Sequence, residues 1–538
     1  MTDPTEISEY GPVRWFPTDG LTSAPGIADR CTVDVVRQAV AHIKGVEVTS
    51  VAVNTSGRHE MAAGGGLPDF CDVRLRQRGP GGHTAVITVW VPLAWNGRFI
   101  GTVGGGTRTT TDVQHSDVFR IVTLPRALMN GFAAASTDGA NRDERPSSWA
   151  LDLATGELDR ELIRNWVHRS THDMTVVGKA VVEGIHGSAP LYSYLQGTSG
   201  GGRQALMEAQ RYPEDYDGIW SAEPAINWSR FVPAAMWPVL VMKEYANPLA
   251  PAKLEAFRQG AIEAGRGADA AAPPFITTLD APVWDPHELV GTSTEAGVIT
   301  ATDATVMGKI WEGPRSPDGG FRWFGLRPGT ESWGNTGAEA GLAMTAEVDG
   351  TLVPVPFPIA EAYVGAWVCR DPEWDWTTLT FAEFDDLFDR SVREFHELDT
   401  DNPDLSELRD RGGKLLLTHG LDDEVIFAMG TVHYFRRVLD AMGGVEGTDS
   451  FARLFLTPGD GHSHVTAAGP GVTLAAGMAA LMDWVENGRA PDTLQVKRYD
   501  PAGSTVTMTG AVGAYPSAPA TRAPSIPGNA STAGSPTT

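Results

Sequence analysis

The stretch that decides the fold runs from Leu191 to Arg211, LYSYLQGTSGGGRQALMEAQR. Its first six residues form an apolar and aromatic run typical of a buried strand, and residues 202–211 have a helical pattern that ends before Pro213. The pentapeptide between them, GTSGG, matches G-x-S-x-G and predicts a serine on a tight strand-to-helix turn. Flanking glycines let the backbone close around that serine, and the following helix N-terminus stabilises nearby negative charge. The segment therefore predicts Ser199 as a nucleophile.

Strand-like and helix-like segments alternate on both sides of this unit. Short apolar or β-branched runs occupy residues 84–91, 99–103, 132–136, 415–418 and 454–456, and residues 173–187 have helical spacing. This alternation is typical of a mostly parallel sheet covered by helices, and the predicted fold class is α/β.

A nucleophilic serine needs a base and an acid. In α/β-hydrolases both follow the serine in the chain, each in a loop after a strand, in the order acid and then histidine. Asp423 and His462 have this order and these loop positions, and Asp422 and His464 are the competing assignments. In this interpretation the histidine takes the serine proton, and the aspartate holds the imidazole in the required tautomer.

The oxyanion hole of such a site needs two main-chain N–H groups. One should belong to Gly200, directly after the nucleophile, and the other to an early glycine-rich loop, for which Gly105 and Gly106 are the candidates. The surrounding run GTVGGGTR fits neither G-x-G-x-x-G nor the Walker pattern, so it disfavours nucleotide binding.

The charge and composition of the chain disfavour some classes of binding partner. The chain has 538 residues, with 42 Lys and Arg against 67 Asp and Glu, and its net charge of −25 disfavours nucleic acid or anionic membrane as partners. No apolar run is long enough to span a membrane. The first residues carry no basic start or apolar run, which predicts a cytoplasmic protein if the N-terminus is untrimmed. A small-molecule ester substrate is the expected partner, and the oligomeric state is open.

The alternating pattern stops in the middle of the chain. Residues 227–400 are rich in Trp, Pro and Gly and predict an inserted lid domain between two catalytic segments, 1–226 and 401–501. Residues 502–538 are rich in Ala, Pro, Ser, Thr and Gly and predict a low-complexity tail, weakly docked or disordered. At least half of six tryptophans in the lid are expected in its core, and the others in an aromatic platform over Ser199: Trp311, Trp323, Trp333, Trp367, Trp374 and Trp376.

The chain resembles the tannase and feruloyl esterase family of α/β-hydrolases over about residues 28–500. The strongest portion is GTSGGGRQALMEAQRYPEDYDG at 197–218, and shorter strings are WNGRF at 95–99, DPEWD at 371–375 and WVENG at 484–488. The resemblance implies an esterase without a cofactor, built from a catalytic domain and a lid. It also implies the triad Ser199, Asp423 and His462.

The departures from this family concern cysteines and calcium. The family usually has cysteines, joined as a disulfide, where this chain has Thr198 and Ser463, so packing and a contact between these two residues are expected to hold the histidine loop. The family's calcium loop is replaced by GADAAAPP at 267–274, which predicts no metal there. Cys31 and Cys71 match the family's N-terminal disulfide, and Cys369 is expected to be a buried free thiol.

The predicted function is therefore that of a serine carboxylic ester hydrolase that forms an acyl-enzyme, acting on aromatic or phenolic acid esters. One alternative keeps the triad in an acyltransferase or thioesterase-like enzyme of secondary metabolism. Another is a catalytically inactive hydrolase fold that serves as a binding module, which the intact order of Ser199, Asp423 and His462 argues against.

Overall fold

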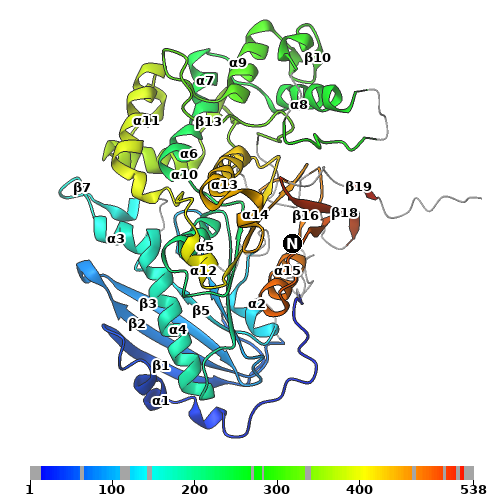
Figure 1. Cartoon of the computed structure of the whole chain (residues 1–538). Helices are drawn as coiled ribbons and strands as arrows, with labels where there is room; N and C mark the ends of the chain where they lie inside the picture. The colour runs from blue at the N-terminus through cyan, green and yellow to red at the C-terminus, as the bar shows by residue number, and fades with distance from the viewer. Residues whose placement is uncertain are drawn as a thin grey trace, which may run out of the picture.

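The computed structural model describes residues 14–60, 66–109, 121–141, 148–267, 272–280, 284–333, 341–462, 468–500, 505–516 and 522–525. Its main feature is one large sheet covered by helices, which confirms the predicted α/β-hydrolase fold (Figure 1). In spatial order its described strands are β1 (Val46–Asn54), β2 (Phe70–Arg78), β3 (Thr84–Pro92), β5 (Ala133–Thr137), β4 (Arg98–Thr102), β8 (Tyr192–Thr198), β9 (Gly218–Ala222), β14 (Lys414–Gly420), β15 (Ala452–Thr457), β18 (Val506–Tyr515), β17 (Thr493–Tyr499) and β16 (Gly471–Val472), with β19 (Arg522–Ser525) beside β18.

The centre of the sheet is parallel and its flanks are antiparallel. Strands β5, β4, β8, β9, β14 and β15 run in one direction, whereas β1 to β3 and β16 to β19 pair antiparallel. In a sheet of this kind the carboxyl ends of the parallel strands form one edge, and ligands bind beyond that edge. Ser199 directly follows β8, and the loops after β14 and β15 leave the same edge.

Helices cover both faces of the parallel strands. One core lies between the sheet and five helices: α1 (Val33–Ala39), α4 (Ser170–His186), α5 (Gly200–Arg211), α12 (Ser406–Asp410) and α13 (Ala428–Met442). The other core lies between the opposite face of the sheet and two helices: α2 (Leu124–Met129) and α15 (Leu474–Asn487). Leu415 and Leu417 of β14 are buried in the first core and Leu416 in the second. A strand buried on both faces has a continuous apolar run, which in β14 is Leu415-Leu416-Leu417.

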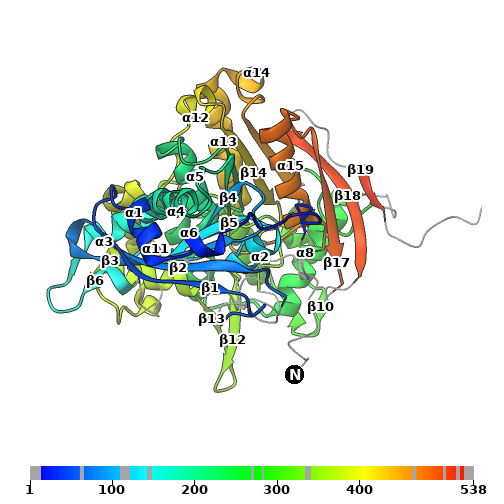
Figure 2. The same ribbon diagram turned by 90° about the horizontal axis from the view of Figure 1, so that it is seen from below.

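A helical region lies above the sheet in Figure 1, between β9 and β14 in the chain. Its main elements are α6 (Trp228–Ala234), α7 (Trp237–Glu244), α8 (Pro251–Arg266), α9 (Ala301–Glu312), α10 (Pro358–Tyr363), α11 (Phe381–Phe395), and the hairpins β10 (Ser293–Thr294) with β11 (Gly297–Val298) and β12 (Met344–Val348) with β13 (Thr351–Val355). Figure 2 shows β12 and β13 projecting from the molecule. The core of this region also contains Trp166 and Phe427, from outside 227–400, so the domain boundaries stay a prediction.

The prediction of a low-complexity tail is wrong for part of 502–538. Val506–Tyr515 forms β18, which pairs with β17 and β15 inside the large sheet. Met508 and Val512 are buried on one face of this strand. Gly and Ala residues lie between these larger side chains. The alternation of a strand is therefore not visible when the segment is judged by its composition alone. Residues 526–538 lie outside the described residues.

Two of the three cysteines are paired in the structure. Cys31 and Cys71 form a disulfide between the loop before α1 and strand β2. Cys369 is unpaired and half-buried, and burial raises the pKa of its thiol.

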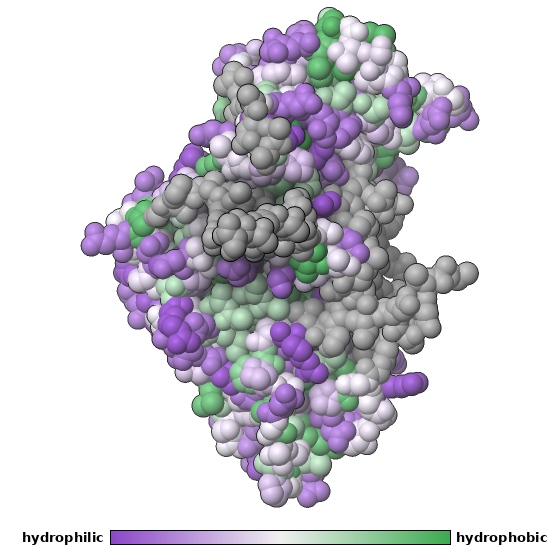
Figure 3. All heavy atoms as spheres, turned by 90° about the vertical axis from the view of Figure 1, so that its right-hand side faces the viewer, coloured by the Kyte–Doolittle hydropathy of each residue, from purple (hydrophilic) through white to green (hydrophobic). Residues whose placement is uncertain are grey.

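Among the described residues, no helix is both long enough and apolar enough to cross a membrane. Hydrophilic side chains are spread over the described part of the face shown in Figure 3.

Candidate active site

Ser199 occupies a strained turn between β8 and α5. Its backbone has φ 64° and ψ −126°, a left-handed conformation that residues other than glycine rarely adopt. The neighbouring glycines are required by close backbone approach: an added Cβ at Gly197 would stand 2.2 Å from the Gly201 carbonyl oxygen, and one at Gly202 would stand 2.4 Å from that of Ala222. The turn therefore presents the serine at the start of α5, at the carboxyl edge of the sheet.

The early glycine loop lies directly against this turn. An added Cβ at Gly200 would stand 2.3 Å from the carbonyl oxygen and 2.8 Å from the nitrogen of Gly106, and its third neighbour would be the Gly105 carbonyl carbon. The loop is tied to α5 because the Gly104 N–H donates to the Gln204 side chain at 3.3 Å. The predicted oxyanion residues Gly200, Gly105 and Gly106 are thus brought together, and their role stays a proposal.

Asp423 and His462 meet in the loops after β14 and β15. His462 Nδ1 is 2.8 Å from Asp423 Oδ2, and both side chains are buried. The other carboxylate oxygen, Oδ1, accepts from the main-chain N–H groups of Val425 and Ile426 at 2.8 and 2.7 Å. A carboxylate at Nδ1 favours the tautomer with its proton on that nitrogen, which leaves Nε2 available as a base.

The electrostatics of this pair favour its charged form. Burial alone would raise the pKa of Asp423, but the charge of His462 and hydrogen bonds from His419 and His462 hold that pKa well below its usual range. Burial alone would lower the pKa of His462, but the Asp423 carboxylate outweighs it and raises the pKa to about 9. An imidazole so stabilised as a cation is suited to accept a proton during a reaction.

The competing candidates lie elsewhere or outside the described residues. The Asp422 carboxylate lies 3.7 Å from the guanidinium Nε of Arg327, in the helical region. His433, on α13, is exposed, and its ring lies 6.5 Å from that of Trp323. His464, Ser463 and hence the predicted Thr198–Ser463 contact lie outside the described residues.

Two buried acids near His462 were not predicted from the sequence. Glu424 accepts a hydrogen bond from the His462 main-chain N–H. Glu223 follows β9 with a φ of 40°, is buried, and raises the pKa of His462. The run Asp422-Asp423-Glu424 after a strand was a visible signal for Glu424, whereas Glu223 had none.

The six tryptophans singled out in the sequence lie in or against the core of the helical region. Trp323, Trp367 and Trp376 are buried, which confirms the expectation of core positions for at least half of them. Trp311, Trp333 and Trp374 are partly buried and pack against the same core. Because these three rings are only partly buried, an aromatic platform over Ser199 stays a prediction.

A histidine and two acids form the one group among the described residues that has the composition of a cation site. Ligand atoms of His172, Glu208 and Asp215 lie within 4.8 Å of one another, beside α4 and α5. The 2.6 Å between His172 Nδ1 and Asp215 Oδ2 is a hydrogen-bond distance, whereas two ligands of a tetrahedral zinc ion stand about 3.3 Å apart. Burial raises the pKa of Glu208 well above its usual range. A neutral Glu208 beside a hydrogen-bonded His172–Asp215 pair therefore needs no metal ion to balance its charge.

Excess EDTA is accordingly expected to leave both kcat and the melting temperature unchanged. The same outcome is expected for the loop at 267–274, of which residues 268–271 lie outside the described residues. Activity and melting temperature should be measured with and without chelator. Inactivation by EDTA that calcium reverses would contradict the calcium prediction, and reversal by zinc alone would contradict the interpretation of His172, Glu208 and Asp215.

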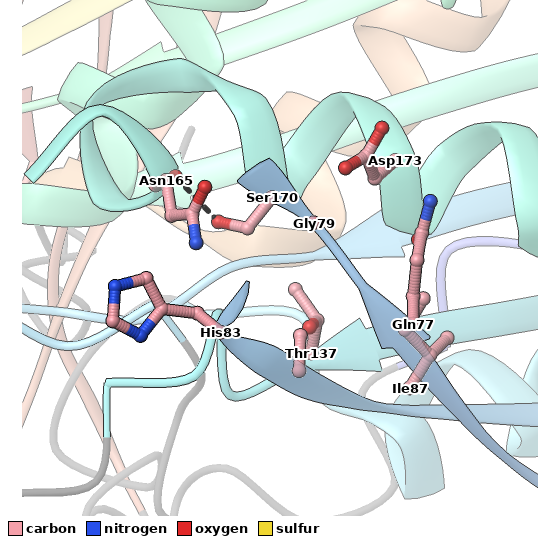
Figure 4. Close-up of a pocket in the computed structure, with 9 residues that line it drawn as sticks. Gln77, Gly79, His83, Ile87, Thr137, Asn165, Ser170 and Asp173 are labelled. Carbon is pink, nitrogen blue, oxygen red and sulfur yellow. Dashed lines mark hydrogen bonds between the residues drawn. The ribbon is translucent and has the colours of Figure 1, made fainter. Parts of the chain in front are cut away.

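A separate polar cavity is too small for an ester. Figure 4 shows its lining between β2, β3 and α4, with Asp173 and Gln77 among the polar side chains. Its volume is about 10 Å³, the space of one water molecule. Pockets for small-molecule ligands are typically about 300–1,000 Å³. This cavity therefore does not compete with the strand-end site as a substrate pocket.

Comparison with known proteins gives the family. A sequence model described as "Tannase and feruloyl esterase" matches residues 75–533. A probable feruloyl esterase of Arthroderma benhamiae is 34% identical over 520 residues, which is 93% of each chain. A mono(2-hydroxyethyl) terephthalate hydrolase of Piscinibacter sakaiensis is 27% identical over 510 residues, 83% of this chain and 81% of that one.

The solved structures agree in fold. Tannin acyl hydrolase of Aspergillus niger superposes with a TM-score of 0.78 at 23% sequence identity, and the match covers 92% of this chain and 94% of that chain. The chain belongs to the tannase and feruloyl esterase family and is a carboxylic ester hydrolase.

Proposed function

We propose that the protein hydrolyses esters through a Ser199–His462–Asp423 triad and an acyl-enzyme. The observation that carries the proposal is the 2.8 Å contact between His462 Nδ1 and Asp423 Oδ2, in loops at the same sheet edge as the strained Ser199 turn. His462 Nε2 takes the proton of Ser199 as the serine oxygen attacks the ester carbonyl. It then gives the proton to the departing alcohol, and a water molecule cleaves the acyl-enzyme by the same steps.

The Gly200 turn and the glycine loop would stabilise the oxyanion. The negative oxygen forms at the N-terminus of α5, where main-chain N–H groups are not used within the helix. The close backbone approach of Gly200 to Gly105 and Gly106 supports donors from both segments. Such donors are worth about 10²–10³ in kcat in acyl-transfer enzymes.

For the substrate we propose esters of aromatic or phenolic acids. The support is the names of relatives along most of the chain: a probable feruloyl esterase and a terephthalate monoester hydrolase. These acyl groups share a flat aromatic ring conjugated with the ester carbonyl, directly in terephthalate and through a CH=CH group in ferulate. The acyl site therefore has to accept a ring of that shape.

A panel of esters tests the proposal. Methyl ferulate, methyl gallate, a terephthalate monoester and p-nitrophenyl acetate should be compared by kcat/KM. Faster turnover of an aromatic acid ester than of the acetate, despite the better leaving group of the acetate, supports the substrate class. Preference for the acetate contradicts it, and transfer to an added alcohol in preference to water would favour the acyltransferase alternative.

Replacing Gly200 by alanine is expected to lower kcat by about 10²–10³-fold. The new Cβ would collide with the Gly106 backbone and push the glycine loop away from the turn. The matched control is Gly308→Ala in α9, where a Cβ would meet only Pro286 at 3.7 Å, an ordinary contact. Equal kcat for Gly200→Ala and Gly308→Ala would show that Gly200 and the glycine loop do not form the oxyanion hole.

A further inference from the structure

Glu424 connects the loop of the acid to the loop of the histidine. It directly follows Asp423, and the residue is 3% exposed. Its Oε2 accepts a hydrogen bond from the main-chain N–H of His462 at 2.9 Å. The same oxygen lies against Gly461, where an added Cβ would stand 2.6 Å from it. Two consecutive acids therefore hold His462, Asp423 at the ring and Glu424 at the main chain.

The main-chain bond matters because the ring bond alone does not fix the imidazole. With only the Nδ1 contact to Asp423, the His462 backbone could shift while that contact was kept, and Nε2 would move relative to Ser199. A buried N–H without an acceptor is also unfavourable, so the loop would move to satisfy it. Because Glu424 accepts a hydrogen bond from this N–H, the loop does not have to move to satisfy it.

We propose that Glu424 is a positioning residue that sets the place of His462 relative to Ser199 by accepting the His462 main-chain N–H. The inference rests on the proposed function, because only a catalytic His462 needs a fixed position. The required group is a hydrogen-bond acceptor of this length, and a negative charge is not needed.

The charge surrounding Glu424 explains why an uncharged acceptor suffices. Burial and the adjacent Asp423 carboxylate raise the pKa of Glu424 to about 8, so it is mainly neutral at pH 7. Ionisation above that pH adds a second negative charge beside His462, and Glu424 accordingly raises the pKa of His462. The other charged groups around this position are Asp422, Arg258 and Glu331, which line one small cavity with Glu424, together with Arg327 beside Asp422 and Glu223 near His462.

Two substitutions separate the acceptor from its charge. Glu424→Gln keeps an acceptor of the same length, and kcat at pH 7 should stay within about threefold of wild type. Its profile of kcat/KM against pH should begin to rise at lower pH, because the amide never adds a charge beside His462. Glu424→Leu removes the acceptor, and kcat should fall by about 10²-fold with KM within about twofold, as for a misplaced catalytic group.

A third variant disturbs the contact between Glu424 and His462 from the side of the histidine loop. Gly461→Ala places a Cβ against Glu424 Oε2, so it should lower kcat like Glu424→Leu without changing any titratable group. The matched controls are Glu331→Gln and Glu331→Leu, because Glu331 lines the same cavity but pairs with Arg258 at 3.4 Å. Both controls should keep wild-type kcat.

The outcomes distinguish this inference from the proposed function. Glu424→Leu with wild-type kcat, while Ser199→Ala is inactive, overturns the positioning role and leaves the triad standing. Equal losses in Glu424→Gln and Glu424→Leu also overturn it, because an acceptor then fails to rescue. If Glu424→Leu does not fold, Glu424→Gln and Gly461→Ala decide. An active Ser199→Ala overturns the proposed function itself.

Discussion

Replacing Ser199 by alanine is expected to lower kcat by about 10⁶-fold, the scale of losing a serine nucleophile in a triad enzyme. The serine oxygen is the atom that attacks the ester carbonyl, and alanine leaves nothing in its place to form the acyl-enzyme. Alanine tolerates the backbone φ of 64° no worse than serine does, so the turn should persist. Steady-state hydrolysis of the fastest ester in the panel and the melting temperature give both readouts.

The control for this variant is Ser193→Ala in β8. Ser193 is a buried serine of β8, and it lies at the end of the strand opposite to the Ser199 turn. Its substitution should leave kcat unchanged. If Ser199→Ala keeps a tenth of the activity, the nucleophile is elsewhere and the strained turn has another use. If it is inactive but unfolded, Ser199→Cys offers a nucleophile of similar shape as the second variant.

Local patterns allowed the β8–α5 unit and the parallel centre of the sheet to be predicted. The apolar run, the glycines and the helical spacing all lie within residues 191–211, so no distant contact was needed to interpret them. The meeting of Asp423 with His462 followed from topology, because consecutive parallel strands end at one edge. These predictions concern elements whose sequence and environment agree.

The choice between Asp422 and Asp423 depended on side-chain direction. Adjacent residues point to different sides, and here the Asp423 carboxylate is turned by the N–H groups of Val425 and Ile426, while Asp422 faces Arg327. No pattern in the sequence encodes that turn.

Two other features needed distant contacts. Strand β18 is stabilised by pairing with β17 and β15, and its Gly and Ala content conceals it. The bond from Glu424 to the His462 main chain joins residues 38 apart in the sequence. Such features follow from the assembled sheet and not from the local sequence.

Replacing Asp423 by asparagine is expected to lower kcat by about 10⁴-fold, because an amide next to Nδ1 no longer selects the tautomer with a free Nε2. It also removes the charge that raises the pKa of His462. His462 must be neutral to act as a base, so kcat/KM of the wild type rises with pH as the imidazole loses its proton. Without the carboxylate this rise should begin at lower pH in the residual activity of the variant.

Asp422→Asn is the matched control, since it changes the neighbouring buried carboxyl in the same way. Asp422 lies 3.7 Å from Arg327, whereas Asp423 is the carboxylate at His462 Nδ1, so the loss of Asp422 should lower the melting temperature and not kcat. Breaking a buried ion pair costs about 3–5 kcal/mol of stability when one charge stays behind. If Asp422→Asn instead loses about 10⁴-fold in kcat and Asp423→Asn stays active, Asp422 is the acid of the triad. The 2.8 Å contact between Asp423 and His462 would then hold the loop without taking part in the reaction.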